Sequence, residues 1–281
     1  MLLSPVVASQ LAARLLDEGL YEHTRGLRFE DAGHGYDAFG LHPAYVAMGL
    51  GLTRFFYERY FRVESRGAEH IPTEGGAIIA ANHSGTIPID GMMLWTDVVR
   101  QTEPARVPRA VADYFVPMLP VVGTVFARAG VVAGSRGNVR KLLEAGNLMM
   151  IFPEGVPGIG KNFKDRYRLQ PFRVGHAELA IRHRVPVVPV GIVGAEEQLP
   201  QIARIEGVSL FGVPYLPITL SPVPLPVRYH LRYGEPISLH KDYRRNQADD
   251  PEVVEEAARR VQVAVQSLVD QGLREREGVF R

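Results

Sequence analysis

Two apolar stretches of the chain each end in polar side chains that can do chemistry. Asn82, His83 and Ser84 directly follow the run GAIIAA, and Asp90 comes six intervening residues after the histidine. A histidine can serve as a general base when a carboxylate orients its second ring nitrogen, and Asp90 is the nearest candidate for that role. The same residues also fit a structural interpretation, in which Asp90 caps a helix and His83 bonds to its own loop. The residues alone leave both interpretations open.

The second stretch ends in an acid. Glu154 follows the run NLMMIFP, and Gly155 comes next, where the missing side chain lets the backbone approach a ligand closely. Sites in parallel α/β sheets lie beyond the carboxyl ends of the strands, so we expect Glu154 and His83 to border one crevice. The competing interpretation of Glu154 is a solvated loop glutamate.

Other chemistries fit the sequence poorly. The absence of cysteine excludes thiolate nucleophiles and thiolate metal sites, and a formal net charge of +1 gives no overall attraction to nucleic acid. Gly155, Gly160 and Lys161 have the spacing of a nucleotide phosphate cradle, but Asn162 stands where that motif has the hydroxyl that holds magnesium. Ser84 lacks the flanking glycines of a nucleophile elbow, and no residues have metal-ligand spacing. We expect neither a metal nor another cofactor.

The elements around these candidates alternate between β-type and helical patterns. Short β-type runs occupy residues 76–82, 106–112, 129–133, 147–152, 185–193 and 225–233. A helix is expected over 135–146, with Ser135 or Asn138 as its cap. Another is expected over 249–272, where Val254, Ala257, Val261, Val265 and Leu268 share one face. Strands alternating with helices predict an α/β fold with a largely parallel sheet flanked by helices.

Residues 1–62 differ in pattern, and we expect an N-terminal helical portion ahead of an α/β domain over 63–281. Residues 44–52 are apolar, and the aromatic and basic stretch TRFFYERYFR follows. This combination is typical of an interfacial helix lying on a membrane, and equally of a helix docked on the protein's own core. No stretch offers the roughly 20 apolar residues of a membrane span, and we find no secretory signal peptide. The expected location is peripheral, on the cytoplasmic side of a membrane.

Four blocks of the sequence, NHSGTIPID, GTVFARAG, IFPEG and VPVVPVGIVG, have the order and spacing found in the phospholipid/glycerol acyltransferase superfamily. The chain resembles this superfamily over residues 63–236. NHSG, RYRLQPF and VGAEE make it most similar to bacterial lysophospholipid acyltransferases of the monoacylglycerol/diacylglycerol acyltransferase-like branch. The resemblance implies the glycerolipid acyltransferase fold. It also implies transfer of a fatty acyl chain from acyl-CoA or acyl carrier protein to a glycerolipid or lysophospholipid hydroxyl, without a metal.

The resemblance also implies roles for individual residues. His83 would take the proton of the acceptor hydroxyl, and Asp90 would hold and polarise His83. The matching blocks imply further substrate-binding residues: Asn82, Ser84 and Gly85 beside the histidine, Phe152, Pro153, Glu154 and Gly155 in the acceptor block, and Arg128 for an acceptor phosphate. Pro189 corresponds to the block that shapes the acyl side. Lys161 and Lys164, with Arg166 and Arg168, form a basic loop that can bind phosphate or remain solvated.

Two departures from the family pattern bear on these expectations. The family's histidine and aspartate are separated by four residues, but here Pro88 stands at that position and a longer turn must return Asp90 to His83. The common phosphate-acceptor version continues FPEG with Thr-Arg, whereas this chain has Val156 and Pro157. Two alternatives therefore stay open beside the transferase. One is a non-catalytic lipid-binding scaffold, and the other is an ester or thioester hydrolase that uses Ser84 or an activated water.

Overall fold

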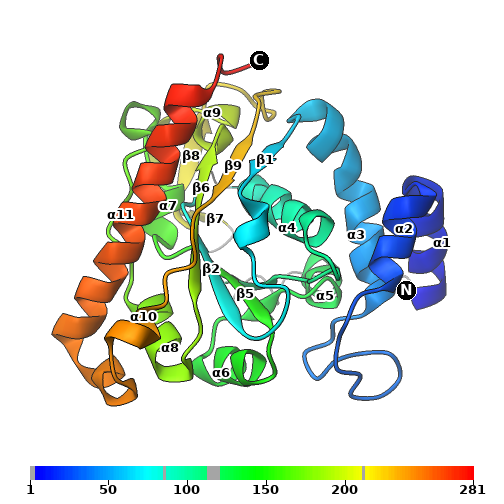
Figure 1. Cartoon of the computed structure of the whole chain (residues 1–281). Coiled ribbons are helices and arrows are strands. Elements are labelled where there is room, and N and C mark those ends of the chain that lie inside the picture. The colour runs from blue at the N-terminus through cyan, green and yellow to red at the C-terminus, as the bar shows by residue number, and fades with distance from the viewer. Residues whose placement is uncertain (1–3, 85–86, 113–120, 211–212) are drawn as a thin grey trace.

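A seven-stranded sheet occupies the centre of the chain in this computed structural model, which describes residues 4–84, 87–112, 121–210 and 213–281 (Figure 1). In spatial order the strands are β1 (Glu64–Arg66), β9 (His230–Tyr233), β6 (Val187–Val193), β2 (Ala77–Ala81), β5 (Leu148–Ile151), β3 (Arg109–Ala112) and β4 (Val132–Ala133). All neighbouring strands are parallel except β6 and β9. The predicted, largely parallel α/β sheet is confirmed, and only β1 and β9 run against the other five.

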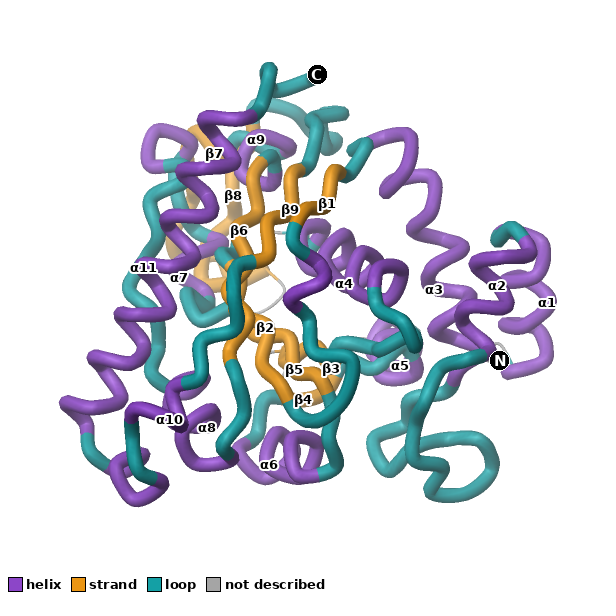
Figure 2. Tube along the Cα trace, in the orientation of Figure 1, coloured by secondary structure: helices purple, strands orange, loops and turns teal. Residues whose placement is uncertain are grey.

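Helices cover both faces of this sheet (Figure 2). The α-helices are α1 (Pro5–Leu15), α2 (Glu18–Arg25), α3 (Pro43–Phe55), α4 (Ile89–Gln101), α5 (Val122–Arg128), α6 (Arg136–Glu144), α7 (Val156–Ile159), α8 (Gly175–His183), α9 (Ala195–Gln198), α10 (Leu239–Asp242) and α11 (Pro251–Glu275). The shorter turns are the π-helical η1 (Phe56–Tyr60) and the 3-10 turns η2 (Ala68–His70), η4 (Phe163–Asp165) and η5 (Arg245–Asp249).

The side chains of β2 show how the layers are built. Ile79 joins the apolar cluster that contains α3 and α4, whereas Ile78 joins the cluster that contains α6, α8 and α11. Successive side chains of a strand point to opposite faces, and every residue of β2 is buried. A strand covered on both sides therefore has the continuous apolar run seen in the sequence.

Side-chain caps begin two of the helices that flank the sheet. The Ser135 hydroxyl accepts a hydrogen bond from the backbone N–H of Asn138 at 3.1 Å, so Ser135 rather than Asn138 caps α6. The Asp250 carboxylate accepts from the Glu252 N–H at 3.0 Å, and Pro251 follows at the first helical position of α11. The predicted apolar face of α11 is buried except at Leu268, which is half-buried beside a buried Val269.

The N-terminal helices pack on the protein's own core. Leu50 and Phe61 are buried in the same apolar cluster as Ile79 of the sheet. Below them, the buried Asp97 of α4 accepts hydrogen bonds from the Tyr57 and Tyr233 hydroxyls, each at 2.5 Å. Most of α3 therefore matches the docked-helix interpretation, and the aromatic stretch that follows it divides between the core and the surface.

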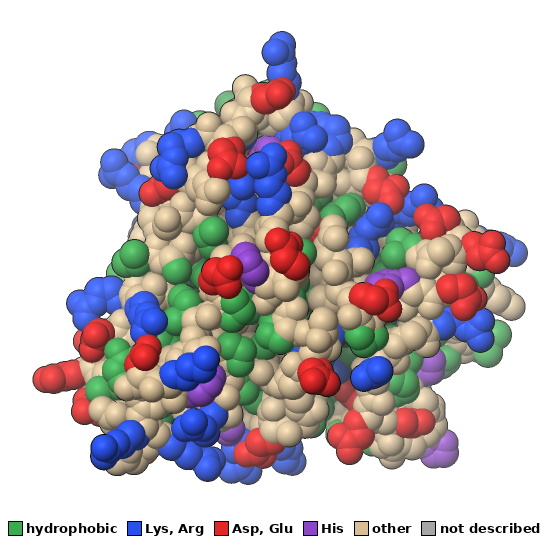
Figure 3. Space-filling model, in the orientation of Figure 1, with side chains coloured by type: hydrophobic (Ala, Val, Ile, Leu, Met, Phe, Trp, Pro, Cys, Tyr) green, Lys and Arg blue, Asp and Glu red, His purple; other side chains and the backbone are tan. Residues whose placement is uncertain are grey.

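The exposed part of that stretch lies near the end of α3. Leu52, Phe55 and Phe56 are 54%, 59% and 43% exposed. Within the described residues, no helix is long and apolar enough to cross a membrane. Acidic and basic side chains are interspersed over the face of the molecule in Figure 3, which agrees with the near-neutral formal charge.

One element was not predicted from the sequence. Strands β7 (Gln201–Leu210) and β8 (Val213–Thr219) pair antiparallel in a hairpin that is separate from the seven-stranded sheet. Pro214 and Pro217 interrupt the β-type pattern of the second strand, because proline cannot donate to a ladder. A two-stranded sheet tolerates these prolines since each strand has a free edge.

Candidate active site

Strands β2 and β5 bring the two polar strand ends together. They are parallel neighbours, with Ala77 opposite Leu148 and Ala80 opposite Ile151. The residues that follow each strand therefore emerge at the same edge of the sheet. The backbone N–H of His83 donates to the Glu154 carboxylate at 3.0 Å. The expected proximity of His83 and Glu154 is confirmed.

His83 and Asp90 form a hydrogen-bonded pair despite the longer turn between them. The His83 Nδ1 lies 2.7 Å from Asp90 Oδ2, and the aspartate side chain is fully buried. Asp90 also accepts from the backbone N–H groups of Ser84 and Gly91, each at 2.8 Å. Asp90 lies in the first turn of α4, where the helix dipole favours a negative charge. With Nδ1–H donating to the carboxylate, Nε2 is the ring nitrogen left to accept a proton.

Neighbouring groups set the pKa and the orientation of the His83 imidazole. Burial opposes protonation, but the Asp90 carboxylate outweighs burial, with a smaller contribution from Glu154, so the pKa of His83 lies above its ordinary value of 6.5. The Phe152 ring stacks on the imidazole, with ring centroids 4.3 Å apart and an interplanar angle of 26°. The side chain of His83 keeps 17% of its surface exposed. A held imidazole with an exposed edge is the arrangement that a general base needs.

Glu154 is a buried link between loops rather than a solvated glutamate. One carboxylate oxygen accepts from the His83 N–H, and the other accepts from the Gln170 N–H at 2.7 Å. The Lys161 ammonium lies 3.2 Å from the second oxygen. Glu154 thereby fixes the backbone on which His83 is carried.

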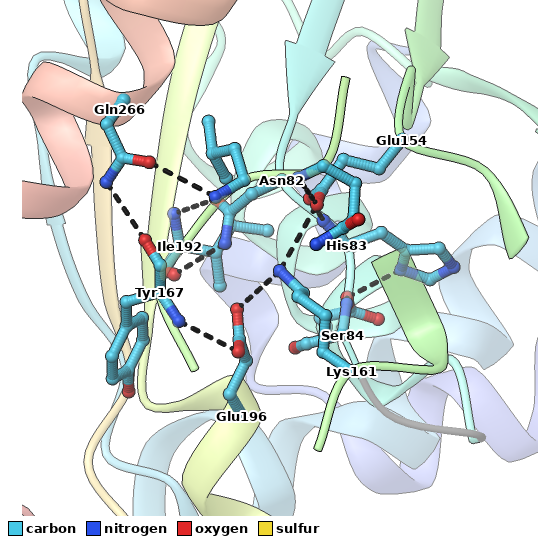
Figure 4. Close-up of polar contacts among 12 residues, drawn as sticks. Asn82, His83, Ser84, Glu154, Lys161, Tyr167, Ile192, Glu196 and Gln266 are labelled. Atoms are coloured by element: carbon cyan, nitrogen blue, oxygen red, sulfur yellow. Dashed lines mark hydrogen bonds and ion pairs between the residues drawn. The ribbon is translucent and has the colours of Figure 1, made fainter. Parts of the chain in front are cut away.

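Lys161 lies between two buried carboxylates, as Figure 4 shows. Its ammonium is 2.9 Å from Glu196 Oε1, and its side chain is 4% exposed. Burial opposes the charge of Lys161, but Glu196 and Glu154 outweigh this and raise its pKa above the ordinary 10.5. The expectation that Lys161 belongs to an open phosphate-binding loop needs correction, because both carboxylates already satisfy the ammonium.

A second layer of contacts extends this network toward the C-terminal helix. The Tyr167 N–H donates to Glu196 at 2.9 Å, and the Gln266 side-chain amide of α11 donates to the Tyr167 carbonyl at 2.9 Å (Figure 4). The Tyr167 hydroxyl donates to Glu197, which also pairs with Arg276. Sequence reasoning assigned no role to these residues, although the VGAEE motif contains both glutamates.

Asn82 and Ser84 flank His83 in different ways. The Asn82 side-chain amide exchanges two hydrogen bonds with the backbone of Ile192, at 2.7 and 3.0 Å, and so joins β2 to β6. Ser84 is 2% exposed, and its hydroxyl is buried without a hydrogen-bond partner among the described residues. Gly85, expected to bind substrate, lies outside the described residues.

The other residues predicted to bind substrate differ in their burial. Pro153 is buried, and its carbonyl accepts from the Arg173 N–H at 2.9 Å. Gly155 has a φ of +60°, and a Cβ there would lie 2.9 Å from the Arg173 guanidinium carbon, so glycine is required by the turn itself. Pro189 is buried within β6. Lys164 is exposed, as expected for a solvated cation.

Arg128 at the end of α5 contacts the loop before α3. Its guanidinium lies over the Tyr36 ring, 4.1 Å from the centroid, and donates to the Gly40 carbonyl at 3.3 Å. These contacts commit part of the guanidinium to the N-terminal portion. Among the described residues, Arg128 makes no hydrogen bond or ion pair to the His83 network, and no three metal-ligating side chains converge to hold an ion.

Comparison with known proteins places this site in a class. The acyltransferase family model matches residues 62–193, which include His83, Asp90 and Glu154. The chain belongs to the glycerolipid acyltransferase superfamily. It is therefore an acyltransferase, for which an acyl donor is one substrate.

Individual relatives cover most of the chain. An uncharacterized protein of Mycobacterium tuberculosis is 39% identical over 258 residues, which are 88% of this chain and 72% of the relative. The mouse "DGAT1/2-independent enzyme synthesizing storage lipids" is 30% identical over 212 residues, 74% of this chain and 59% of that enzyme. The crystal structure of the 1-acyl-sn-glycerophosphate (LPA) acyltransferase PlsC from Thermotoga maritima matches with a TM-score of 0.56 at 17% identity, over 98% of both chains. This structural likeness shows a shared fold.

Proposed function

We propose that the protein transfers a fatty acyl chain from acyl-CoA or acyl carrier protein to a hydroxyl of a glycerolipid or lysophospholipid. The observation that carries this proposal is the His83–Asp90 pair, 2.7 Å apart at the carboxyl edge of the sheet, which leaves the second imidazole nitrogen as the proton acceptor. A free alcohol is a poor nucleophile at neutral pH, so removing its proton in the transition state accelerates acyl transfer.

The reaction needs one proton transfer in each direction. His83 Nε2 takes the proton of the acceptor hydroxyl while the oxygen attacks the thioester carbonyl, and Asp90 stabilises the imidazolium that forms. The tetrahedral intermediate then expels the thiolate, which takes the proton back from His83. The ester and the free thiol are the products, and the enzyme returns to its starting protonation.

The contacts of Lys161 and Arg128, which were expected to bind an acceptor phosphate, bear on which acceptor the enzyme uses. Lys161 is paired with Glu154 and Glu196, and Arg128 is partly committed to Tyr36. Thr-Arg after FPEG is replaced by Val156 and Pro157. These features favour neutral mono- or diacylglycerols over lysophosphatidic acid. The mouse relative, named for the synthesis of storage lipids, supports testing neutral acceptors first.

Such acceptors reside in membranes, and we propose that the protein works at the cytoplasmic membrane surface. Leu52, Phe55 and Phe56 support this location, because exposed aromatic and aliphatic side chains suit the headgroup boundary.

The first test is free-thiol release from a long-chain acyl-CoA with a panel of monoacylglycerols, diacylglycerols and lysophospholipids. We expect acceptor-dependent release that falls about 10²- to 10⁴-fold in His83→Ala, the usual contribution of a general base. His34→Ala, at an exposed loop histidine, is the matched control. Unchanged turnover in folded His83→Ala protein would remove the proposed base.

The same assay separates the alternatives. Thiol release without acceptor would indicate a hydrolase, and its loss in Ser84→Ala would implicate the buried Ser84 hydroxyl that has no partner among the described residues. Lipid binding without release from either thioester donor would indicate the scaffold.

A further inference from the structure

The β7–β8 hairpin presents different faces inward and outward. In its register Ala203 pairs with Ile218 and Ile205 with Leu216, so these four side chains share one face. Ile205 and Ile218 are 47% and 40% exposed. An apolar sheet face without a covering layer is uncommon on a protein that acts alone in water.

The opposite face of the hairpin packs against the loop that leaves the active site. Tyr215 is 5% exposed, and a Cβ at Gly160 would lie 2.6 Å from its hydroxyl. Gly160 immediately precedes Lys161 of the buried ion triad. The hairpin therefore rests on the segment that follows Glu154, and this contact supports a pair of strands that would be marginal alone.

The outer face continues to the aromatic end of α3. After β8, Leu220 and Val223 are 68% and 60% exposed. The next residue, Pro224, accepts a hydrogen bond from the Tyr60 hydroxyl at 2.6 Å. The Tyr60 ring in turn contacts Phe55 and Phe56, at centroid distances of 6.3 and 5.9 Å. We name the exposed residues of this continuous surface the apolar rim: Phe55, Phe56, Ile205, Ile218, Leu220 and Val223.

Arginines border the apolar rim. The segments 52–62 and 199–229 together hold five arginines and two glutamates; of these arginines, Arg54 pairs with Asp17 and Glu58, and Arg228 lies 4.0 Å from Glu64. Arg59 is exposed, and Arg62 donates to backbone carbonyls, including those of Tyr60 and Pro226. Aromatic and aliphatic side chains bordered by arginine complement an anionic bilayer, where the rings enter the headgroup boundary and the guanidinium groups meet phosphate.

From this continuity and charge we infer that the apolar rim docks on an anionic lipid bilayer, and that the β7–β8 hairpin and the 220–224 loop are a second membrane contact beside the end of α3. The choice of lipid as the occupant rests on the proposed function. Docking at the hairpin holds the Glu154–Lys161 segment next to the membrane, since Tyr215 packs on Gly160. A lipid acceptor then reaches the site without crossing water.

The test measures partition onto vesicles of phosphatidylcholine with phosphatidylglycerol by co-sedimentation. The double variant Ile205→Gln/Ile218→Gln should lower the partition coefficient about tenfold or more, because two partly exposed isoleucines lose their transfer into lipid. Val263→Gln on α11, also an exposed aliphatic position at 64%, is the matched control and should bind as wild type does. Unchanged partition of the folded double variant overturns the inference.

Two further readouts identify the occupant. In Ile218→Trp, brominated lipids should quench the fluorescence of the new tryptophan, while the buried Trp95 gives a constant background. In Val263→Trp they should quench no fluorescence. A wild-type dimer in sedimentation that the double variant dissociates, with vesicle binding unchanged, would assign the surface to a second copy of the chain and overturn lipid docking. The vesicles contain no thioester, so binding is measured without turnover. A protein that docks through the hairpin but releases no thiol would refute the transferase and leave this inference standing.

Discussion

Replacing Lys161 with methionine should destabilise the fold strongly, although the sequence places Lys161 in a loop. The substitution leaves two buried carboxylates, Glu154 and Glu196, without the ammonium that lies 3.2 and 2.9 Å from them. Removing one partner of a buried ion pair costs about 3–5 kcal/mol, because an uncompensated buried charge remains. Backbone N–H donors at both glutamates persist, so we expect the lower part of this range, about 3 kcal/mol.

Thermal and urea unfolding of the Lys161→Met protein measure this loss. For a chain of this size, about 3 kcal/mol corresponds to a fall in Tm of roughly 6–12 °C. Lys164→Met, in the same loop but exposed, should stay within about 0.5 kcal/mol of wild type. The double variant Lys161→Met/Glu196→Gln removes one of the two opposed carboxylates. It should be more stable than the sum of the single changes by about 1–3 kcal/mol.

The result that would refute this reasoning is a Lys161→Met protein that unfolds within about 2 °C of wild type, a change smaller than 1 kcal/mol. Such a result would mean that the ammonium is not the counter-charge of Glu154. Additive effects of Lys161→Met and Glu196→Gln on the free energy of unfolding would refute it too, because they would mean that the two side chains do not interact.

Four more predictions rest on contacts of His83, Asp97 and Asp250. kcat/KM should rise with pH to a plateau, with its inflection above pH 6.5, since Asp90 raises the pKa of His83 and the base must be neutral. In Asp90→Asn the inflection should move to lower pH and the plateau should fall. An unmoved inflection would mean that Asp90 does not set the pKa of His83. The same raised pKa makes this pair's contribution to stability full below pH 6.5 and lost as the pH rises through the folded-state value, which urea titrations at several pH values measure. Asp97→Asn should lower the free energy of unfolding by about 2 kcal/mol through weakened hydrogen bonds to two tyrosines, whereas a wild-type midpoint in urea would contradict their importance. Asp250→Ala should cost about 1 kcal/mol by removing the cap of α11, and an unchanged Tm would mean that Pro251 suffices to begin the helix.

The sequence predicted those features that depend on neighbouring residues or on a repeating pattern of apolar residues. The apolar runs of β2, β5 and β6 identified the buried strands, because each must be covered on both faces. The polar residues after β2 and β5 predicted that His83 and Glu154 share an edge, since parallel neighbours end together. Ser135 or Asn138 was predicted as a cap, and the structure selects Ser135, whose hydroxyl accepts from the N–H three residues later.

Contacts between distant segments were not predictable in this way. The burial of Lys161 depends on Glu196, 35 residues later, so nothing in the basic loop distinguished it from the exposed Lys164. Phe61 belongs to the core while Phe55 and Phe56 are exposed, and the aromatic composition of the stretch did not distinguish them. A vesicle-binding variant should therefore spare Phe61. The sequence also did not predict that β9 runs antiparallel to β6, since an alternating pattern of apolar and polar residues is the same in either direction.

The contacts of α11 have a consequence for the order in which the chain can mature during synthesis. Gln266 bonds to Tyr167, Arg276 pairs with Glu197, and β9 separates β1 from β6 in the sheet. A ribosome must therefore release residues 230–276 before segments made much earlier find their partners. Until then the part of the chain already made has the edge of β6 uncovered and Glu197 without Arg276. We expect nascent chains truncated before residue 230 to recruit chaperones, and acyl transfer to begin only after α11 has docked.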